Sequence, residues 1–474
     1  MSEEIKQRSL IPADLNTGQQ EAYIQMRAFI EAHGQDMYLL EGYAGTGKTY
    51  LVGKILRYVK EKHSNWRIAV TAPTNKAVKV LMRSGSMNDS KVKFQTIHKL
   101  LGLKEEITAD GKQIFTRNKY EECSIEEHHL IIIDEVSMLN DDLFQEIQQY
   151  AGIVKIIFMG DPAQIPPVGR EDCIPFKESG REKYKIQRYL LTEIMRQTEG
   201  NPILAAGFAL REDLNNPSSP VPAVTNLTDE GHGLDFIKFS DPSGRNRLSD
   251  LLEEYFVCPE FKTNSDHAKV IAWRNKTIGK LNHIIRSLIY KGYQAEGLPI
   301  AKIMDGEKLV ANKPIVDKYN IMLFTTNDEF EVVESDVCHR TIASETEAIR
   351  IGYYHATVEY FDVRGSRQRR KIDILHEDSA EDFDRILMGL KKYAISKKGY
   401  DAKKAWVKYY EFMRQFADVG YNYAITCHKA QGSTYQNVFV IEDDIDTNQN
   451  VFERNRIKYT AYTRPTNKLF VIKS

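Results

Sequence analysis

The feature that most constrains this chain is a glycine-rich stretch that follows a short apolar run. Residues 42–49 read Gly-Tyr-Ala-Gly-Thr-Gly-Lys-Thr, which fits the pattern G-x-x-x-x-G-K-[ST], and they lie between an expected strand at 37–40 and an expected helix. Glycines let backbone N–H groups turn toward an anion, and the start of a helix adds its positive dipole end. A glycine-rich turn without a ligand is the alternative. The order of strand, glycines, Lys-Thr and helix favours a phosphate-binding loop.

The side chains of this loop have separate expected roles. Lys48 is expected to reach the β- and γ-phosphates of a nucleotide, and the Thr49 hydroxyl to bind a magnesium ion. A nucleotide with β- and γ-phosphates and Mg²⁺ are therefore the expected ligands of this loop. The expected nucleotide contacts within the loop are Gly42, Ala44, Gly45, Thr46, Gly47, Lys48 and Thr49.

Length and composition describe a chain with several domains. The 474 residues are too many for one core, so about two to four domains are expected. The 65 basic and 66 acidic residues nearly cancel, and any polyanion must then be held by local patches rather than by a global field. Five scattered cysteines without a C-x-x-C pair suggest neither a zinc cluster nor a disulfide framework. A polar start and apolar runs of strand length predict no signal peptide, no membrane span and a cytoplasmic location.

Two further apolar runs end in polar side chains that a parallel sheet would bring to one edge. The run 130–133 delivers Asp134, expected to hold magnesium, and Glu135, expected to polarise the attacking water. A helix N-terminal cap is the alternative for this pair. The run 154–159 leads to Gln164, whose neutral amide suits the sensing of a γ-phosphate, with a plain Asp-Pro turn as the alternative.

Two segments near the phosphate loop were weighed between a ligand role and a local one. A helix expected at 17–32 carries Gln19, whose amide can both donate to and accept from an adenine edge. A capping turn with exposed glutamines is the alternative that the local sequence favours. The strand at 67–72 leads into the polar loop 71–76, which is expected beside the phosphates or as a simple Pro-Thr helix start.

Two segments read as insertions. The polar segment 103–124 predicts a hairpin around Asp110-Gly111, and Phe115 is its one large apolar side chain, either packed or exposed for use. Alternation within 321–340 and 351–375 predicts antiparallel strands of a small β barrel inserted in a second α/β domain.

A basic segment follows the expected barrel. Residues 390–410 interleave lysines with Tyr393, Tyr400, Trp406, Tyr409 and Tyr410. This pattern suits single-stranded nucleic acid, because lysines bind phosphates and rings stack on bases. A helix with a solvated lysine face and aromatic side chains turned to the barrel is the favoured alternative.

The motifs follow one another in a recognisable order, and the chain resembles superfamily 1 helicases, more narrowly the RecD and Dda branch. The resemblance implies an α/β fold with two RecA-like P-loop domains, a small β-hairpin pin and an SH3-like β-barrel insert. It also implies ATP in the cleft between the two domains and single-stranded DNA across the top. The motifs that carry it are residues 42–49, 71–76, 96–98, 134–138, 160–164, 191–197, 426–434 and 459–464.

By this resemblance the chain divides into four parts. The ATP-binding domain covers 1–102 and 126–190, and the pin covers 103–125. The second RecA-like domain covers 191–300 and 420–474. The SH3-like insert, with its basic and aromatic helical extension, covers 301–419.

The resemblance also assigns residues. Gln19 matches an adenine-reading glutamine, Arg196 and Arg464 match arginines that reach the γ-phosphate, and Gln431 matches a residue that faces the nucleotide. Phe115 matches the aromatic of the strand-separating pin. The DNA path is expected along Pro73, Thr74, Asn75, Thr96, His98, Arg274, Asn275, Thr426 and His428.

The expected function is an ATP-dependent DNA helicase that moves 5′ to 3′ on single-stranded DNA and unwinds duplex. A protein-displacing translocase or an RNA helicase is the alternative within the class, and an ATP-switched recombination scaffold is the alternative outside it. Expected partners are single-stranded DNA, single/double-strand junctions, and replication, recombination or single-strand-binding proteins. The protein is expected to act as a monomer in the cytoplasm, or in the host cytoplasm if it is encoded by a virus, in association with the nucleoid.

Overall fold

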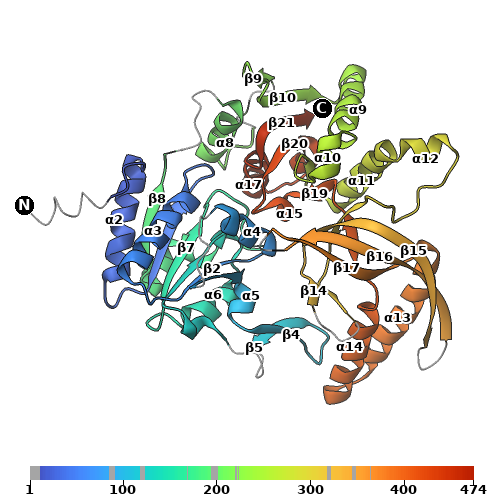
Figure 1. The fold of residues 1–474 in the computed structure, drawn as a ribbon, viewed down its shortest axis with the longest axis horizontal. Helices are drawn as coiled ribbons and strands as arrows, with labels where there is room; N and C mark the ends of the chain where they lie inside the picture. Colours follow the sequence, from blue (N-terminus) through green and yellow to red (C-terminus); the bar gives the residue numbers. More distant parts are fainter. Residues whose placement is uncertain are drawn as a thin grey trace, which may run out of the picture.

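Three large sheets organise the chain. The computed structural model describes residues 11–84, 91–117, 123–167, 169–193, 201–218, 221, 224–317, 322–343, 348–362 and 365–474. Two six-stranded sheets form the centres of a first lobe (residues 11–193) and a second lobe (201–300 and 422–474), and a five-stranded sheet forms the insert (301–421). Figure 1 shows the two lobes side by side, with the insert beside both of them.

The first sheet is parallel throughout, with the strand order β3-β2-β6-β7-β1-β8. Apolar strands buried on both faces are typical of such sheets. The run expected at 130–133 forms β6 without change, and the run expected at 154–159 forms β7 one residue later. The strands are β1 (Met37–Gly42), β2 (Ile68–Ala72), β3 (Val92–Thr96), β6 (Leu130–Ile133), β7 (Lys155–Gly160) and β8 (Gln187–Leu191).

Helices cover both faces of this sheet. Alternate residues of each strand enter opposite cores: Leu40 packs with the helices of one face, and Leu39 with those of the other. One face carries α2 (Thr17–Glu31), α3 (Lys48–Lys62) and α4 (Asn75–Ser84), and the other carries α5 (Ile97–Leu100) and α6 (Asp141–Gln148). Short helices α7 (Glu178–Tyr184), η1 (Ile125–Glu127), η2 (Val136–Met138) and η3 (Ile174–Phe176) complete the lobe.

A hairpin projects from the first lobe. Strands β4 (Leu103–Ile107) and β5 (Gln113–Arg117) pair antiparallel, with Glu105 opposite Phe115, and the turn at Asp110-Gly111 closes them. The predicted hairpin is therefore present. The side chain of Phe115 lies outside what the structure describes.

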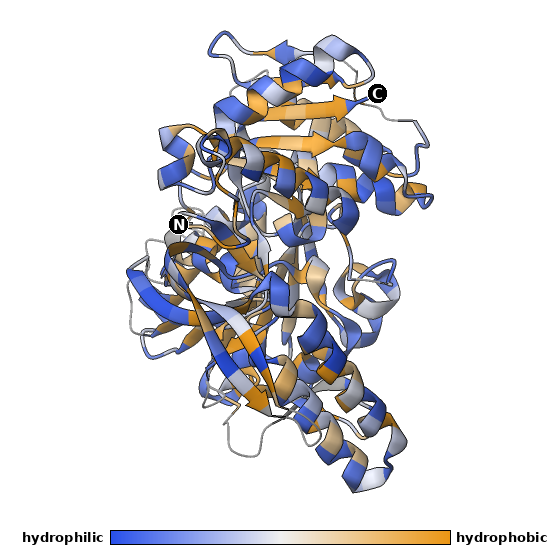
Figure 2. Cartoon of the chain, turned by 90° about the vertical axis from the view of Figure 1, so that its right-hand side faces the viewer, coloured by the Kyte–Doolittle hydropathy of each residue, from blue (hydrophilic) through white to orange (hydrophobic). Residues whose placement is uncertain are grey.

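The second sheet repeats the design of the first. Its order is β19-β11-β20-β21-β10-β9, parallel except for the edge strand β9. The strands are β9 (Asn226–Leu227), β10 (Gly233–Lys238), β11 (Ala268–Ala272), β19 (Ala424–Thr426), β20 (Tyr435–Ile441) and β21 (Pro465–Lys473). The helices are α8 (Pro202–Glu212), α9 (Pro242–Phe256), α10 (Pro259–Thr263), α11 (Asn275–Ile289), α15 (Cys427–Ala430), α16 (Glu442–Asp446) and α17 (Val451–Tyr462). Figure 2 shows its apolar strands beneath helices with hydrophilic outer faces.

The insert is an antiparallel sheet with the order β17-β16-β15-β12-β18. Its last strand reaches Tyr421, just beyond the predicted boundary at 419. The strands are β12 (Lys308–Ala311), β15 (Glu329–Ala343), β16 (Ala348–Phe361), β17 (Arg367–Leu375) and β18 (Val419–Tyr421), beside the small pair β13 (Ile315–Val316) and β14 (Met322–Phe324). Helix α12 (Lys291–Ala295) precedes it, and η4 (Glu377–Ser379), α13 (Ala380–Ser396) and α14 (Gly399–Met413) lie within it.

The favoured interpretation of the basic segment 390–410 was wrong about its aromatic side chains. The segment forms parts of two helices rather than one: α13 ends at Ser396 and α14 begins at Gly399, which has a left-handed φ of 56°. Trp406 and Tyr410 turn to the hairpin of the first lobe, where the Tyr410 hydroxyl donates to the Gly111 carbonyl at 2.8 Å. Tyr400 is 72% exposed. Local periodicity placed these rings on a buried face but did not identify what covers it.

Candidate nucleotide and nucleic-acid site

The phosphate-binding loop lies between β1 and α3, as predicted. Gly45 and Gly47 have φ values of 82° and 79°, which side-chain-bearing residues rarely adopt. A Cβ atom at Gly42 would lie 2.6 Å from the Thr46 Oγ1 atom, so the close turn needs glycine there. The Lys48 ammonium folds over the loop and donates to the carbonyls of Gly42 and Tyr43 at 2.5 and 3.1 Å. The loop therefore presents backbone amides, a helix start and a cation in one place.

Gln19 is attached to this loop rather than exposed. It forms a capping box with Asn16 at the start of α2, and its Nε2 donates to the Thr46 carbonyl at 3.0 Å. Its side chain is fully buried. The capping alternative was thus right about the local hydrogen bonds and wrong about exposure.

The two carboxylates at the end of β6 lie together beside the loop. The backbone N–H of Glu135 donates to the Asp134 carboxylate at 2.8 Å, and Glu135 adopts a left-handed φ of 54°. Burial, and next the adjacent Asp134, raise the pKa of Glu135 to about 7, against the opposing effects of Arg464 and Lys48. Burial also raises the pKa of Asp134. Such shifts are typical of groups that must exchange protons near neutral pH or bind a cation.

The loop after β7 brings Gln164 to the same edge. Gln164 is 6% exposed, and its buried Oε1 atom has no hydrogen-bond partner within the described part of the chain. Asp161 orders the loop, since its Oδ1 atom accepts the N–H of Ala163 at 2.9 Å. An unpaired buried amide oxygen is costly and calls for a ligand or water.

The second lobe closes the site from the opposite side. Arg464 is buried, donates to the carbonyls of Thr460 and Ser433, and lowers the pKa of Glu135 through its charge. Gln431 donates to the Ile165 carbonyl at 2.8 Å. Arg464 and Gln431 therefore lie at the boundary with the first lobe, and their contacts with a nucleotide stay a prediction. Arg196 lies outside the described residues.

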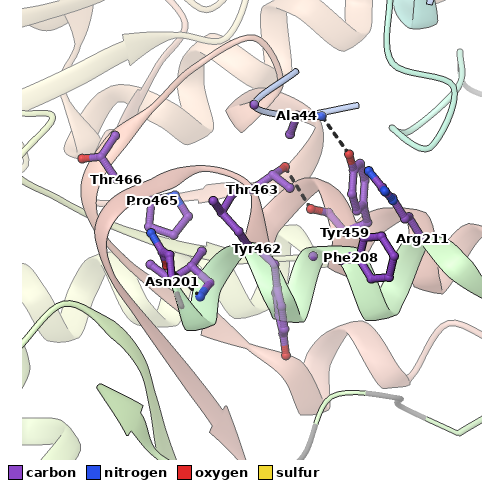
Figure 3. Close-up of a pocket in the computed structure, with 13 residues that line it drawn as sticks. Ala44, Asn201, Phe208, Arg211, Tyr459, Tyr462, Thr463, Pro465 and Thr466 are labelled. Carbon is purple, nitrogen blue, oxygen red and sulfur yellow. Dashed lines mark hydrogen bonds between the residues drawn. The ribbon is translucent and has the colours of Figure 1, made fainter. Parts of the chain in front are cut away.

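Several residues of the site were not identified from the sequence. Helix α17 contributes Arg456, Tyr459 and Thr460, each hydrogen-bonded to the first lobe. A cavity of about 230 Å³ lies between the lobes; Figure 3 shows its wall, and the lining includes Ala44, Gly45, Asn201, Phe208, Arg211 and Tyr459. The Arg211 guanidinium stacks 4.0 Å from the ring centroid of Tyr43. The sequences of the apolar helix α8 and of the phosphate-binding loop do not indicate that the two line one cavity.

The residues predicted to contact DNA fall into two groups. Thr96 and Thr426 cap the short helices α5 and α15 through their hydroxyls, and His98 and His428 each follow two positions later. Burial lowers the pKa of both histidines and so favours the uncharged imidazole. The segments Thr-Ile-His-Lys and Thr-Cys-His-Lys thus occupy the same place in both lobes, at the end of an edge strand.

The remaining predicted contacts are engaged within the protein. The Asn75 amide donates to the Thr325 hydroxyl of the insert at 2.7 Å and to Asp328. Thr74 caps the start of α4, and Pro73 lies partly buried beside it. Arg274 pairs with Asp444 at 2.7 Å, and Asn275 begins α11.

The residues of the first lobe fit a nucleotide with its magnesium ion. The glycine loop has no room for side chains at its closest turn, and the Gln164 oxygen lacks a partner. Asp134 follows β6 and Thr49 lies in the first turn of α3 after β1, with only β7 between the two strands, and hydroxyl and carboxylate oxygens are the ligands that Mg²⁺ prefers. Within the described residues no group of three histidine, cysteine or acidic side chains gathers into a metal site, so a transition-metal centre has no donor set there.

Two family models match the chain at its two ends. The "AAA domain" matches residues 14–232, and the "UvrD-like helicase C-terminal domain" matches residues 421–472. The second match covers the strand, helix and arginine that close the site from the second lobe. Together with the relatives below, these matches bear out the resemblance to superfamily 1 helicases of the RecD/Dda branch.

Similarity to known helicases extends over nearly the whole chain. An uncharacterized protein of Acanthamoeba polyphaga mimivirus is 27% identical, with 96% of this chain and 99% of that protein covered. The ATP-dependent DNA helicase dda of Enterobacteria phage T4 is 25% identical, with 90% and 92% covered. The crystal structure of Pif1 helicase from Candida albicans has a TM-score of 0.51 at 18% identity, with 98% and 95% covered, and shares the fold. No described helix of this chain is long and apolar enough to cross a membrane.

Proposed function

We propose that this protein is an ATP- and Mg²⁺-dependent DNA helicase that moves 5′ to 3′ along single-stranded DNA and unwinds duplex. The observation that carries the proposal is the two-sided site, where Lys48 and Glu135 of one lobe face Arg464 of the other. If hydrolysis needs residues of both lobes, it occurs only when the lobes are closed. Each cycle of ATP hydrolysis is then coupled to a movement of one lobe relative to the other. The phage T4 relative is named an ATP-dependent DNA helicase.

The residues of the site divide the reaction between them. The loop amides and Lys48 bind the phosphates, and Gln19 and Gln431 contact the nucleotide. Magnesium, held by Thr49 and Asp134, supplies charge neutralisation on the phosphate oxygens. Glu135 accepts the proton of the attacking water, which its pKa of about 7 suits. Gln164 senses the γ-phosphate, and Arg464 and Arg196 neutralise the charge of the transition state, a contribution of ~10³–10⁵ in rate.

The DNA-side assignments follow the same proposal. Single-stranded DNA runs along Thr96, His98, Thr426 and His428, and the hairpin of β4 and β5 is the pin, with Phe115 at the strand junction. The five-stranded insert is the SH3-like barrel. The domains are 1–102 with 126–190, the pin 103–125, 191–300 with 420–474, and the insert 301–419. ATP is needed because DNA stacking averages ~1.4 kcal/mol per base-pair step, which passive binding cannot supply over many steps.

The ATP site is tested by Lys48→Ala. This variant should abolish ATP hydrolysis while single-stranded DNA binding, followed by fluorescence anisotropy, stays within about threefold of wild type. Robust hydrolysis by the variant would falsify the site assignment.

Polarity and unwinding are tested by strand displacement on duplexes with a 5′ or a 3′ tail. Displacement of the 5′-tailed duplex alone is expected. Displacement of the 3′-tailed duplex reverses the polarity, and DNA-stimulated hydrolysis without displacement indicates a translocase. Stimulation by RNA in place of DNA indicates an RNA helicase, and the absence of any stimulated turnover indicates an ATP-switched binding protein.

A further inference from the structure

Tyr459, the first residue of the motif 459–464, makes a link between the lobes that its sequence does not predict. Its side chain lies on α17 and is 2% exposed. The hydroxyl donates to the Asp161 Oδ2 atom at 2.7 Å and accepts the backbone N–H of Ala44 at 3.1 Å. Figure 3 shows the second of these bonds reaching from α17 to the phosphate loop. One side chain of the second lobe thus binds two catalytic loops of the first.

The chemistry of the hydroxyl makes this link specific. A phenol has one proton to donate and lone pairs to accept with, and here the carboxylate takes the first and the amide the second. Burial, and next the charge of Asp161, raise the pKa of Tyr459 well above its ordinary value, so the donated proton stays on the hydroxyl. Both bonds need the hydroxyl itself, and an apolar ring of the same shape would make neither.

The neighbours of Tyr459 on α17 bind the same loop. Arg456, Tyr459 and Thr460 lie at i, i+3 and i+4, and therefore on one face of the helix. Arg456 donates to the Pro162 carbonyl at 2.9 Å, and the Thr460 hydroxyl accepts the N–H of Ile165 at 3.3 Å. This face of α17 contacts the loop from 161 to 165 on both sides of Gln164.

Asp161 transmits the link to Gln164. Its Oδ1 atom holds the Ala163 N–H, so the carboxylate that Tyr459 binds is also the group that orders the turn before Gln164. The other end of the link is the amide of Ala44, within the phosphate loop. A single hydroxyl of the second lobe therefore connects the loop that binds the phosphates with the loop that carries Gln164.

We propose that Tyr459 is a positioning residue for ATP hydrolysis, which holds the phosphate-binding loop and the Gln164 loop in register from the opposite lobe. This inference rests on the proposed helicase function for its kinetic consequence, although the link itself does not. Tyr459 contacts Ala44 through the backbone N–H, so its loss should act on the closed, reactive arrangement more than on the binding of the nucleotide.

The test compares Tyr459→Phe with Tyr462→Phe. Tyr462 is equally buried on the same helix, but its hydroxyl donates to Glu442 within the second lobe at 3.0 Å. Tyr459→Phe should lower the DNA-stimulated kcat about tenfold, while KM for ATP changes less than about threefold. Tyr462→Phe should change kcat less than about twofold, and the unfolding temperatures of both variants show whether each remains folded.

A double-variant cycle separates positioning from general destabilisation. Asp161→Asn breaks the same link from the other side, so Tyr459→Phe combined with Asp161→Asn should lose no more than about twofold beyond the worse single variant. The inference is overturned if the kcat losses of Tyr459→Phe and Asp161→Asn multiply in the double variant. It is also overturned if Tyr459→Phe and Tyr462→Phe have equal kcat values.

Hydrogen exchange supplies a measurement that needs no activity. The Ala44 amide should exchange at least about tenfold faster in nucleotide-free Tyr459→Phe than in wild type or Tyr462→Phe. Unchanged exchange in this segment overturns the link. If wild type lacks DNA-stimulated turnover, the proposed function fails, and exchange alone then decides whether Tyr459 binds the phosphate loop.

Discussion

At the scale of single residues, the carboxylate of Glu135 couples chemistry to stability. Burial and the adjacent Asp134 raise its pKa from 4.5 to about 7. The folded chain therefore holds this proton more tightly than the unfolded chain does. The stability that this group contributes is fully present below pH 4.5 and is lost as the pH rises through 7.

Glu135→Gln should relieve this penalty, because the amide carries no charge to desolvate. In the nucleotide-free protein we expect the free energy of unfolding to rise by about 1–3 kcal/mol at about pH 8 and to change little at about pH 5. Denaturant titrations at the two pH values measure it. Glu126→Gln, at an exposed position of the same lobe, is the control and should change the free energy of unfolding little and equally at the two pH values. If Glu135→Gln instead stabilises the protein most at about pH 5, the expected direction of the pH dependence is wrong.

The sequence identified the residues of the site that belong to short motifs, and it missed those whose role depends on a distant partner. Lys48 and the pair Asp134 and Glu135 could be placed because strand, loop and helix follow each other within a few residues. The role of Tyr459 could not be predicted, although the residue begins the motif 459–464, because its hydrogen-bond partners are 298 and 415 positions away.

At the scale of elements, the hairpin of β4 and β5 is held at its tip by α14. Gly111 has a φ of 79°, and a Cβ atom there would overlap the indole ring of Trp406. Ile107 packs into the same small cluster around Trp406. A two-stranded hairpin is marginal alone, so this contact with the insert fixes its direction.

Trp406→Ala should therefore impair strand separation more than single-stranded-DNA-stimulated hydrolysis. We expect the unwinding rate on a 5′-tailed duplex to fall at least about fivefold, with kcat for ATP within about twofold, since the hairpin would lose its support while the cleft is untouched. Tyr400→Ala, on the same helix with an exposed ring, is the matched control and should leave both rates near wild type. Equal losses of unwinding and hydrolysis in Trp406→Ala would exclude the supporting role, and a weaker DNA affinity in Tyr400→Ala would instead favour base stacking on this helix.

The strands and main helices could be predicted because burial on both faces leaves continuous apolar runs and one-sided burial leaves a helical period. The contact between the hairpin and α14 could not. Both elements carry mixed polar and aromatic residues, and such a pattern fits a DNA surface as well as a packed one.

At the scale of the whole molecule, the insert is bound to the first lobe through residues predicted to contact DNA. Asn75 donates to Thr325, and the neighbouring Lys76 pairs with Glu329 at 2.8 Å. Burial alone would raise the pKa of Glu329, but the ammonium groups of Lys76 and Lys269 lower it to about 2. The ion pair therefore persists throughout the physiological pH range, and the arrangement must open before the Asn75 amide can reach a phosphate.

Thr325→Val removes the acceptor of the Asn75 amide while keeping the shape of the side chain. Loss of that hydrogen bond, about 0.5–1.5 kcal/mol, and of the one that the Thr325 hydroxyl donates to Asp328 at 2.9 Å should speed the association of single-stranded DNA about two- to tenfold in stopped-flow fluorescence. Thr357→Val, which loses a hydrogen bond to Glu334 within the insert, should leave association unchanged. Slower association of Thr325→Val would show that the contact assists binding instead.

The connection between the insert and the second lobe affects how easily the insert can change during evolution. Strand β12 near the start of the insert pairs with β18 at its end, Leu309 opposite Tyr421, so the chain leaves and returns on neighbouring strands about 4.8 Å apart. Strand β18 is followed almost at once by β19 of the second sheet. A segment joined at two adjacent points can lengthen, shrink or be replaced through a single graft without disturbing the strands beside it. We therefore expect relatives of this chain to differ most in the insert and least at the nucleotide site between the two lobes.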